Sequence, residues 1–599
     1  MGKTLVNIEN ELINELFRQS LDSGEPDVSR CAEEAHRRLA LNLIYTYLVA
    51  RGVRDVDRIV PECFITDGQA PTAMPFLYAE EIPELCEQLH VTYLNSGFRE
   101  KDGVVKRVVS KENMVARGAV YTQKDVVENI VRNTLRNVKL TSDVRLLDFA
   151  CGTGRFYCEM IKSLVSEGVE PRVAVCECVH ANDIDPVAVN IARLKACSFL
   201  DEITEAELTR IASNVLCENA LTTSQSPDLF SSKEQPMQYD AIVSNPPYLV
   251  LKPSHNTPHA LAEDMRRQVS YYRTSGLYEY SVEGMLNLYQ LSIERMLGML
   301  KENGEMGVIC PSTLFADKSS CKLRKHLLLK NKVRHISYFP ENELLFENNV
   351  TQATNIFHLR KSGTTEEIEM TANGNGFKVS LNVIKSLFPD NMEIPLVSDM
   401  DWRILKKLSK FQKLKSIKHI RNKRGELDLT LDASYITTKP TGHRLVRGKM
   451  VSPEGMKKGG TEYVSEDFVG KKSDDYRRFD YGRARLAGQN ICNIDNRQRL
   501  RFAFCEPSDI LGNSCNYLSS DILTLRRLHI LLSSSLLNWR FKVTSSNNHI
   551  NNYELDELPI VELDAIDAER IFASQAEKDE YVCTLYGLNA EETRYICDR

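Results

Sequence analysis

The sequence predicts a doubly wound α/β domain in the middle of the chain, preceded by a helical region. Two observations predict it. Apolar residues recur at helical spacing over residues 1–115. From about residue 116 to 360 the pattern changes to short apolar runs separated by helical stretches, which is typical of a parallel sheet covered on both faces. The 599 residues leave room for about three or four domains in all.

The helical region opens with two apolar stripes. The first comprises Leu5, Ile8, Leu12, Ile13, Leu16 and Phe17, and the second Leu39, Leu41, Leu43, Ile44 and Leu48. A stripe of this kind normally packs against a core, so we interpret both as structural.

Seven apolar runs are the expected strands of the central sheet. They are VRLLDFA (144–150), CECVHAND (176–183), NVLCEN (214–219), YDAIVSN (239–245), EMGVICP (305–311), VRHISYF (333–339) and TNIFHLR (354–360). Runs of this length, joined by helical segments, predict βαβ units and one seven-stranded sheet.

Composition excludes several classes of protein. Apolar residues make up 42% and the net charge is −6, which is ordinary for a folded water-soluble chain. No apolar run approaches the roughly 18 residues of a membrane span, and the first residues are acidic and amphipathic. The 16 cysteines lack the paired spacing of a zinc site, and the close pair Cys176 and Cys178 has strand-like neighbours. We therefore expect a cytoplasmic protein without a metal, in a reducing compartment.

Charge is unevenly distributed along the chain. Residues 401–550 hold 29 basic and 15 acidic side chains, a net of +14, whereas 551–599 carry −9 and 1–400 carry −11. A basic block inside an acidic protein is either a footprint for a polyanion or a solvated basic face.

A glycine-rich turn follows the first expected strand, in the sequence Asp148-Phe149-Ala150-Cys151-Gly152-Thr153-Gly154. Small residues at the carboxyl end of a strand let the backbone approach a nucleotide, although such turns also serve packing alone. The second strand ends at Asn182-Asp183-Ile184-Asp185-Pro186, where a carboxylate can accept hydrogen bonds from ribose hydroxyls. The alternative is that these residues only begin the next helix.

The fourth strand runs into Ser244-Asn245-Pro246-Pro247-Tyr248. Here the sequence becomes specific. The order GAVYTQ (118–123), DFACGTG, NDIDP, CENAL and SNPPY resembles the gamma-type amino-methyltransferases of bacterial type II restriction-modification systems. The resemblance covers about 116–360 and implies a Rossmann-like domain. It also implies methyl transfer from S-adenosylmethionine to N6 of adenine in DNA.

The resemblance also implies roles for residues at the cofactor. Tyr121 and Thr122 would contact the methionine part, with Asp148 and the turn residues Ala150, Cys151, Gly152, Thr153 and Gly154 nearby. Asp183 would bind the ribose and Ile184 the cofactor adenine, whose amino group Asn219 would read beside Ala220. Two residues depart from the pattern: Gln123 replaces a common proline, and Asn219 replaces a common aspartate.

The Asn-Pro-Pro-Tyr loop has the groups that methylation of an amine needs. The side-chain oxygen of Asn245 and the backbone carbonyl of Pro246 can each accept an N–H bond, which aims the nitrogen lone pair at the methyl donor. Pro246 and Pro247 fix the backbone and lack N–H groups. Tyr248 offers a ring to an adenine flipped out of the duplex. This mechanism requires neither a metal nor a covalent nucleophile.

A second aromatic residue lies in the later stretch LFENNVTQAT (345–354), which resembles the family loop whose ring stacks on the flipped base. We expect Phe346 to form an aromatic clamp with Tyr248; the alternative is a buried core phenylalanine.

The expected domains are a helical domain at 1–115, a methyltransferase domain at 116–395, a mixed α/β target-recognition domain at 396–560 and an acidic helical segment at 561–599. The expected partner is double-stranded DNA near the bacterial nucleoid, bound by a monomer. A separately encoded restriction endonuclease is a candidate second partner, and no membrane is expected.

Other functions compete with this interpretation. A fused nuclease would need an acidic-x-Lys motif, which residues 1–115 lack. Methylation of RNA adenine, or of a protein glutamine by an enzyme with the same tetrapeptide, would use the same loop. A catalytically silent DNA-specificity protein would keep the fold but transfer no methyl group.

Overall fold

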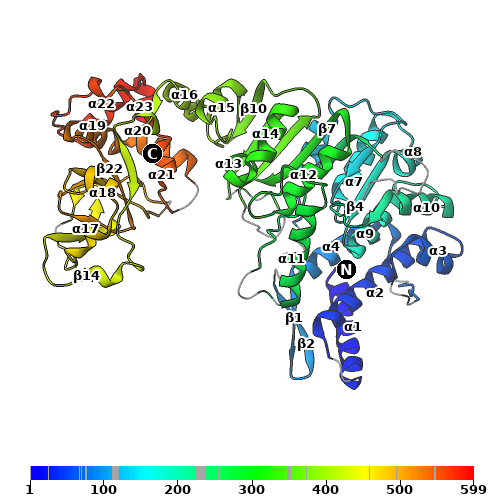
Figure 1. Ribbon diagram of the computed structural model, residues 1–599. Coiled ribbons are helices and arrows are strands. Elements are labelled where there is room, and N and C mark those ends of the chain that lie inside the picture. The colour runs from blue at the N-terminus through cyan, green and yellow to red at the C-terminus, as the bar shows by residue number, and fades with distance from the viewer. Residues whose placement is uncertain are drawn as a thin grey trace. The chain divides into compact units, whose positions relative to one another are not determined.

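The computed structural model describes residues 2–23, 26–66, 68, 70–74, 77–110, 120–222, 237–253, 257, 259–341, 343, 345–346, 352–372, 374–457, 459–493, 495–545 and 548–598. The chain forms two compact units (Figure 1). The first comprises Met1–Leu381 with Asp390–Leu396, and the second Asn382–Pro389 with Val397–Arg599. Within the described residues, no helix combines the length and the apolar character that crossing a membrane would require.

A nine-stranded sheet forms the centre of the first unit, in the order β11-β10-β8-β9-β7-β6-β3-β4-β5. The strands are β3 (Leu146–Asp148), β4 (Val179–Asp183), β5 (Val215–Cys217), β6 (Tyr239–Ser244), β7 (Leu300–Pro311), β8 (Lys332–Phe339), β9 (Thr354–Arg360), β10 (Glu367–Ala372) and β11 (Asn375–Ser380). Strands β5, β4, β3, β6 and β7 are parallel, whereas β9 is antiparallel to both β7 and β8. The parallel strands therefore end at one common edge.

The expected count of seven strands was too low. All seven predicted runs form strands of this sheet, but β10 and β11 extend it beyond β8. Buried and exposed residues alternate along β10. Continuous apolar runs identify strands that are buried on both faces, so a strand with alternating burial such as β10 is missed.

The second strand also begins later than expected. Residues 174–178 form a turn of π-helix, and β4 starts only at Val179. Four of these five residues are buried, so the period-two alternation on which a strand prediction relies is absent here.

Helices cover the sheet and build the N-terminal region. The principal ones are α1 (Gly2–Asp22), α2 (Val28–Ala50), α3 (Val56–Cys63), α4 (Ile82–Leu94), α6 (Lys124–Leu135), α7 (Arg155–Ser166), α9 (Pro186–Cys197), α10 (Glu205–Asn214), α11 (His259–Thr274), α12 (Leu288–Met299) and α14 (Cys321–Lys330). A hairpin of β1 (Ser96–Lys101) and β2 (Val104–Val109) follows α4. Local signals fix some starts; the Asp27 carboxylate, for example, accepts hydrogen bonds from the first backbone N–H groups of α2.

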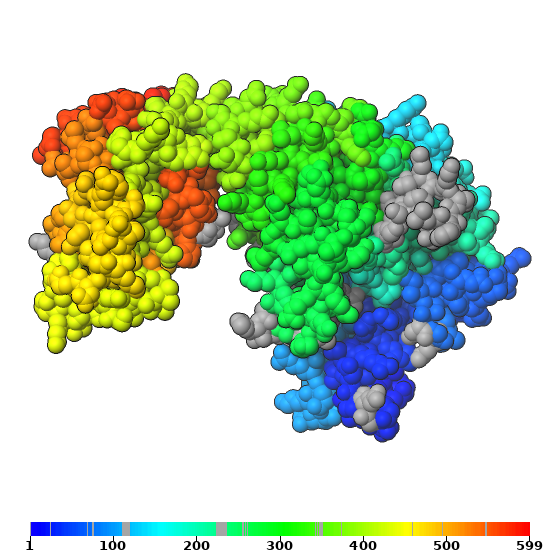
Figure 2. All heavy atoms as spheres, in the orientation of Figure 1, coloured from blue at the N-terminus to red at the C-terminus, as the bar shows by residue number. Residues whose placement is uncertain are grey.

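The N-terminal helices share one hydrophobic core with the sheet. Leu43 of α2 and Leu89 of α4 belong to the same buried cluster as Ile191 of α9 and Leu146 of β3. Figure 2 shows the N-terminal residues, in blue, packed against the segment coloured cyan to teal. These helices therefore lie close to the edge at which the parallel strands of the sheet end.

The described residues of the second unit form two four-stranded sheets, two further two-stranded pairs and a group of helices. One sheet has the order β13-β22-β19-β20 and the other β14-β18-β15-β21. Their strands are β13 (Arg421–Arg424), β14 (Ile436–Thr437), β15 (His443–Val446), β18 (Tyr463–Val464), β19 (Arg485–Gln489), β20 (Phe502–Cys505), β21 (Ile510–Leu511) and β22 (Cys515–Ser519). The main helices are α16 (Asp399–Leu408), α19 (Ile522–Leu532), α20 (Ser535–Thr544), α22 (Gln575–Leu585) and α23 (Ala590–Cys597).

Candidate active site

A cavity of about 350 Å³ lies at the carboxyl edge of the parallel strands. Its walls bring together most residues that the sequence assigned to the cofactor, namely Tyr121, Thr122, the turn 150–153, Asp183, Ile184, Asn219 and Ala220. Asn245 and Pro247 line the same cavity. The proline loop and the glycine turn therefore face one space, although 91 residues separate Asn245 from Gly154 in the sequence.

The other predicted site residues do not line this cavity; they are Asp148, Gly154, Pro246, Tyr248 and Phe346. Gly154 has a positive φ of 82°, and a Cβ there would approach the Cβ of Ala192 to 3.0 Å. A glycine is required at this position so that the turn can pack against α9.

The turn is tied to the strand beside it. The N–H of Cys151 donates to the carbonyl of Asn182 at 2.9 Å, and the N–H of Gly152 donates to Oδ2 of Asp183 at 2.8 Å. The other oxygen of Asp183 accepts the N–H of Asp185 at 2.9 Å. The Asp183 carboxylate is thus oriented by the backbone before any ligand binds.

Asp148 is a buried carboxyl beneath the turn. Its Oδ2 accepts the N–H of Tyr157 at 3.0 Å, and its Oδ1 has no hydrogen-bond partner. Burial raises the pKa of Asp148 well above its ordinary value, and the nearby Asp183 adds to this effect. The carboxyl of Asp148 therefore holds its proton to a higher pH than a carboxyl in water does.

Asn245 has the most informative hydrogen bonds in the cavity. Its side-chain nitrogen donates to the carbonyl of Val120 at 2.8 Å and to the hydroxyl of Thr122 at 3.1 Å. The carbonyl of Val120 can only accept, so it defines which end of the amide is nitrogen. Oδ1 is buried and has no hydrogen-bond partner, so the unused hydrogen-bonding group of this side chain is an acceptor.

Tyr248 and Phe346 are close neighbours. Their ring centroids lie 6.1 Å apart at 74°, and Tyr248 also meets Tyr289 edge to face at 6.4 Å. The hydroxyl of Tyr248 donates to the carbonyl of Ile309 at 3.2 Å. Phe346 is only 2% exposed. The structure therefore brings the two rings together but in an edge-to-face pair; residues 347–351 of the same stretch lie outside the described residues.

Helix α4 contributes residues that the sequence analysis did not assign to the site. His90 and Leu94 line the cavity. Glu87 accepts a hydrogen bond from the hydroxyl of Thr153 at 3.2 Å and pairs with Arg155 and Lys195. Burial alone would raise the pKa of Glu87, but these two cations outweigh it and hold the pKa at about 2. The sequence signal was weak, because Glu87 and His90 share α4 with other polar residues such as Glu84 and Gln88.

Helix α11 supplies a second unexpected wall. Gln268 and Tyr272 line the cavity, and Tyr272 is 1% exposed. The side chain of Asn219 hydrogen-bonds to Tyr272, while its Oδ1 accepts the N–H of Leu221 at 3.1 Å. The adjacent tyrosines of this helix, 271 and 272, were the only sequence hint.

Comparison with known proteins places the central part of this chain among restriction-modification methylases. Residues 177–346 match the model of the Eco57I restriction-modification methylase family. The type II restriction enzyme and methyltransferase RM.Eco57I of Escherichia coli is 28% identical over 302 residues, which are 42% of this chain and 29% of that protein. The methylase subunit of the type I restriction enzyme MpnII of Mycoplasma pneumoniae is 24% identical over 277 residues, 46% of each chain.

Among solved structures, the type IIG restriction endonuclease BpuSI is 13% identical with a TM-score of 0.45, over 94% of this chain and 72% of that one. The chain spans less than half the length of both sequence relatives. The stretch that matches the Eco57I restriction-modification methylase family model, residues 177–346, includes β4, the Asn-Pro-Pro-Tyr loop and Phe346.

Proposed function

We propose that the chain is a site-specific DNA methyltransferase of a restriction-modification or phage-defence system. It would transfer a methyl group from S-adenosylmethionine to N6 of an adenine flipped out of duplex DNA. The observation that carries the proposal is Asn245: it lines the cavity that the glycine turn and Asp183 also line, and its buried Oδ1 has no hydrogen-bond partner. Such an acceptor suits an amine rather than a carbonyl or a phosphate.

The residues of the cavity fit the proposed cofactor. A volume of about 350 Å³ lies in the usual range for a small-ligand site. The Asp183 carboxylate suits two ribose hydroxyls, and the exposed side chain of Ile184 offers an apolar face to a purine. Asn219 stands where it can reach the edge of that purine. When bound, S-adenosylmethionine supplies a methyl group made electrophilic by its sulfonium.

The chain itself would prepare the amine. Asn245 Oδ1 accepts one N–H of the adenine amino group, and the carbonyl of Pro246 accepts the other. Two acceptors on the same side of the nitrogen favour a pyramidal geometry, which releases the lone pair from the ring. The fixed amide orientation means that little reorganisation is needed during the reaction.

The flipped base requires an aromatic neighbour. Tyr248 is the proposed stacking partner, with Phe346 as the second ring of the clamp. Because the two rings meet edge to face here, a base can lie between them only after one ring has moved. Stacking worth roughly 1–3 kcal/mol would offset part of the cost of extruding the base.

We assign target recognition to residues 396–560 and catalysis to residues 116–395. The proposed partner is DNA. The basic block supports this, but internal pairs use part of its charge: Arg485 is buried against Glu426, and Arg444 pairs with Asp509 at 2.6 Å. The remaining exposed cations are available for phosphates. A separate endonuclease and a monomeric state stay predictions.

The test is methyl transfer from labelled S-adenosylmethionine to unmethylated genomic DNA, followed by mapping of the modified base. N6-methyladenine in one recurring sequence motif is the expected product. Asn245→Ala should transfer no methyl group while still binding the cofactor. Methylation of RNA or protein in place of DNA, or an Asn245→Ala enzyme with full turnover, would overturn the proposal.

A further inference from the structure

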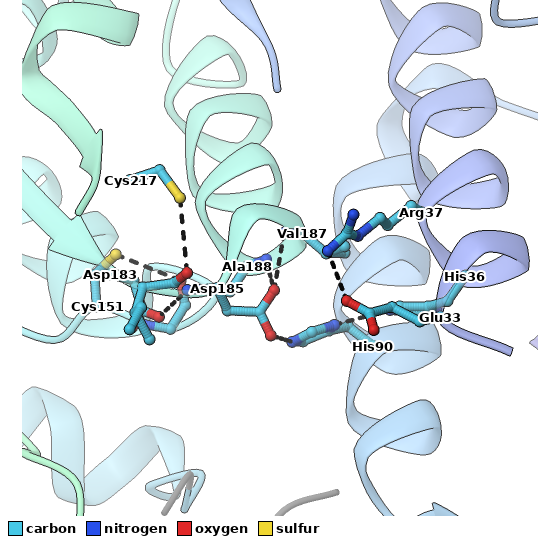
Figure 3. A network of polar contacts seen from close by, with 12 residues as sticks. Glu33, His36, Arg37, His90, Cys151, Asp183, Asp185, Val187, Ala188 and Cys217 are labelled. Carbon is cyan, nitrogen blue, oxygen red and sulfur yellow. Dashed lines mark hydrogen bonds and ion pairs between the residues drawn. The ribbon is translucent and has the colours of Figure 1, made fainter. Parts of the chain in front are cut away.

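Four buried ionisable side chains form a chain from the N-terminal helices to the cavity. Glu9 of α1 lies 2.6 Å from Nδ1 of His36 on α2. Nε2 of His36 lies 2.9 Å from Nδ1 of His90 on α4. Nε2 of His90 lies 3.8 Å from Oδ2 of Asp185, which begins α9 (Figure 3). Each of the four residues is buried.

The number of protons in this chain follows from its geometry. A carboxylate stands at each end, so hydrogen on the imidazole nitrogens that face Glu9 and Asp185 avoids placing a lone pair against a charged oxygen. The contact between the two rings needs a third hydrogen. Two neutral imidazoles supply only two. With both carboxylates ionised, the favourable arrangement therefore holds one extra proton shared by His36 and His90.

The surroundings of the chain account for its other charges. Arg107 of the hairpin pairs with Glu9, and burial, which would raise the pKa of Glu9, is outweighed by His36 and Arg107, so that this pKa is lowered. The ring of Tyr93 stacks on His36 at 4.1 Å. Glu33 and Arg37, which pair with each other on α2, face the same small space. Tyr121 meets His90 edge to face at 6.5 Å.

One end of the chain belongs to the proposed cofactor site. His90 is a wall of the cavity. Asp185 Oδ1 accepts the N–H groups of Val187 and Ala188, and the N–H of Asp185 donates to Asp183. The position of Asp185 therefore fixes the turn that presents Asp183. A neutral His90 whose lone pair faced Oδ2 of Asp185 would disturb that turn.

We propose that His36 and His90 are positioning residues for the ribose end of the cofactor site. Ligand binding there favours the form of this four-residue network in which His36 and His90 share the extra proton. The inference rests on the proposed function, because it assumes that a nucleoside occupies the cavity. The affinity of the cavity for the nucleoside should be greatest at low pH and fall as pH rises, by up to tenfold per pH unit.

The test uses 5′-methylthioadenosine, which has the adenine, ribose and sulfur of the cofactor but no amino-acid group that titrates between pH 5 and 10. Its dissociation constant is measured by calorimetry from pH 5.5 to 9.5 with the full chain. We expect wild-type affinity to fall as pH rises. In His90→Gln and in His36→Gln, affinity should be about tenfold weaker at low pH and independent of pH.

His529→Gln is the matched control. His529 lies in the second unit, where its Nε2 is 3.2 Å from the carbonyl of Phe502, and its replacement should leave the wild-type pH profile unchanged. His36 does not line the cavity, so its effect separates positioning from direct contact. The wild-type profile needs no variant and remains decisive if a variant fails to fold.

The outcomes separate the two proposals. If neither 5′-methylthioadenosine nor S-adenosylmethionine binds at any pH, the proposed cofactor is wrong. If both bind but wild-type affinity does not change with pH, or if the His36 variant keeps the wild-type profile, the cofactor assignment stands and the shared-proton inference is overturned.

Discussion

The side-chain nitrogen of Asn245 lies 3.1 Å from the hydroxyl oxygen of Thr122, across 123 residues of sequence, and this contact helps hold an amide whose nitrogen also donates to the carbonyl of Val120. Replacing Thr122 by Val removes one of two acceptors and should let the amide rotate. We expect the single-turnover rate of methyl transfer to fall about tenfold, which is less than the loss of a direct transition-state contact. Thr122→Ser keeps the hydroxyl and should retain most of the rate; equal rates for the Val and Ser variants would contradict this role.

Tyr272 should contribute to cofactor affinity. Its ring is a buried wall of the cavity, whereas the neighbouring Tyr271 is 37% exposed and does not line it. Tyr272→Ala should weaken binding of S-adenosylhomocysteine about tenfold in calorimetry, because an aromatic wall is lost. Tyr272→Phe removes only the hydrogen bond with Asn219 and should have a smaller effect. Tyr271→Ala, the matched control, should bind as wild type does; a similar loss in that variant would argue against a local contact.

Glu87 should make stability depend on pH. Its pKa of about 2 lies below that of an unfolded glutamate, about 4.3, so the ion pairs stabilise the fold fully above pH 5. This contribution is lost as pH falls from about 4.3 toward 2. At pH 7, Glu87→Gln should lower the free energy of unfolding by about 3 kcal/mol, because two cations lose their buried partner.

Urea denaturation of both proteins at several pH values measures the difference. The difference should stay constant from pH 7 to 5 and shrink below pH 4.5. Glu84→Gln, on the exposed side of the same helix, is the control and should change stability by less than 1 kcal/mol at every pH. A difference that does not change between pH 7 and 3.5 would exclude the ion pairs as its source.

DNA affinity should depend steeply on salt. If residues 401–550 neutralise phosphates, the logarithm of the association constant falls linearly with the logarithm of salt concentration, by about 0.9 per phosphate contact. Fluorescence anisotropy with a duplex between 50 and 300 mM salt measures the slope. Binding of S-adenosylhomocysteine over the same range is the internal control and should change little. A flat response for the duplex would point to a different partner.

The central sheet was predictable because burial on both faces leaves continuous apolar runs in the sequence. Each of the seven runs forms a strand, and the motifs after four of them meet at one edge because parallel strands end together. Strands β10 and β11 were not predicted, since alternating exposed residues resemble a surface segment. The π-helical turn at 174–178 was mistaken for strand because its apolar content is similar.

The parts of the site that sequence reasoning missed are held by tertiary contacts. Glu87 and His90 carry no motif, and only the folded chain brings α4 against the glycine turn 66 residues later. Gln268 and Tyr272 lie on a helix whose polar sequence gives no reason to place it over a cavity. The amide orientation of Asn245 likewise depends on Val120 and Thr122, which no local pattern links to it.

The contact of α4 with the glycine turn also constrains the order in which the protein becomes competent during synthesis. The ribosome produces α4 first, then the turn, then Asn245, and Phe346 about a hundred residues after that. Each of these segments can pack only after the next one has been synthesised. The nascent chain therefore exposes an incomplete packing surface until more than half of the chain has emerged. Nucleoside binding would thus report that the cavity walls, which run from His90 to Ser292 in the sequence, have come together.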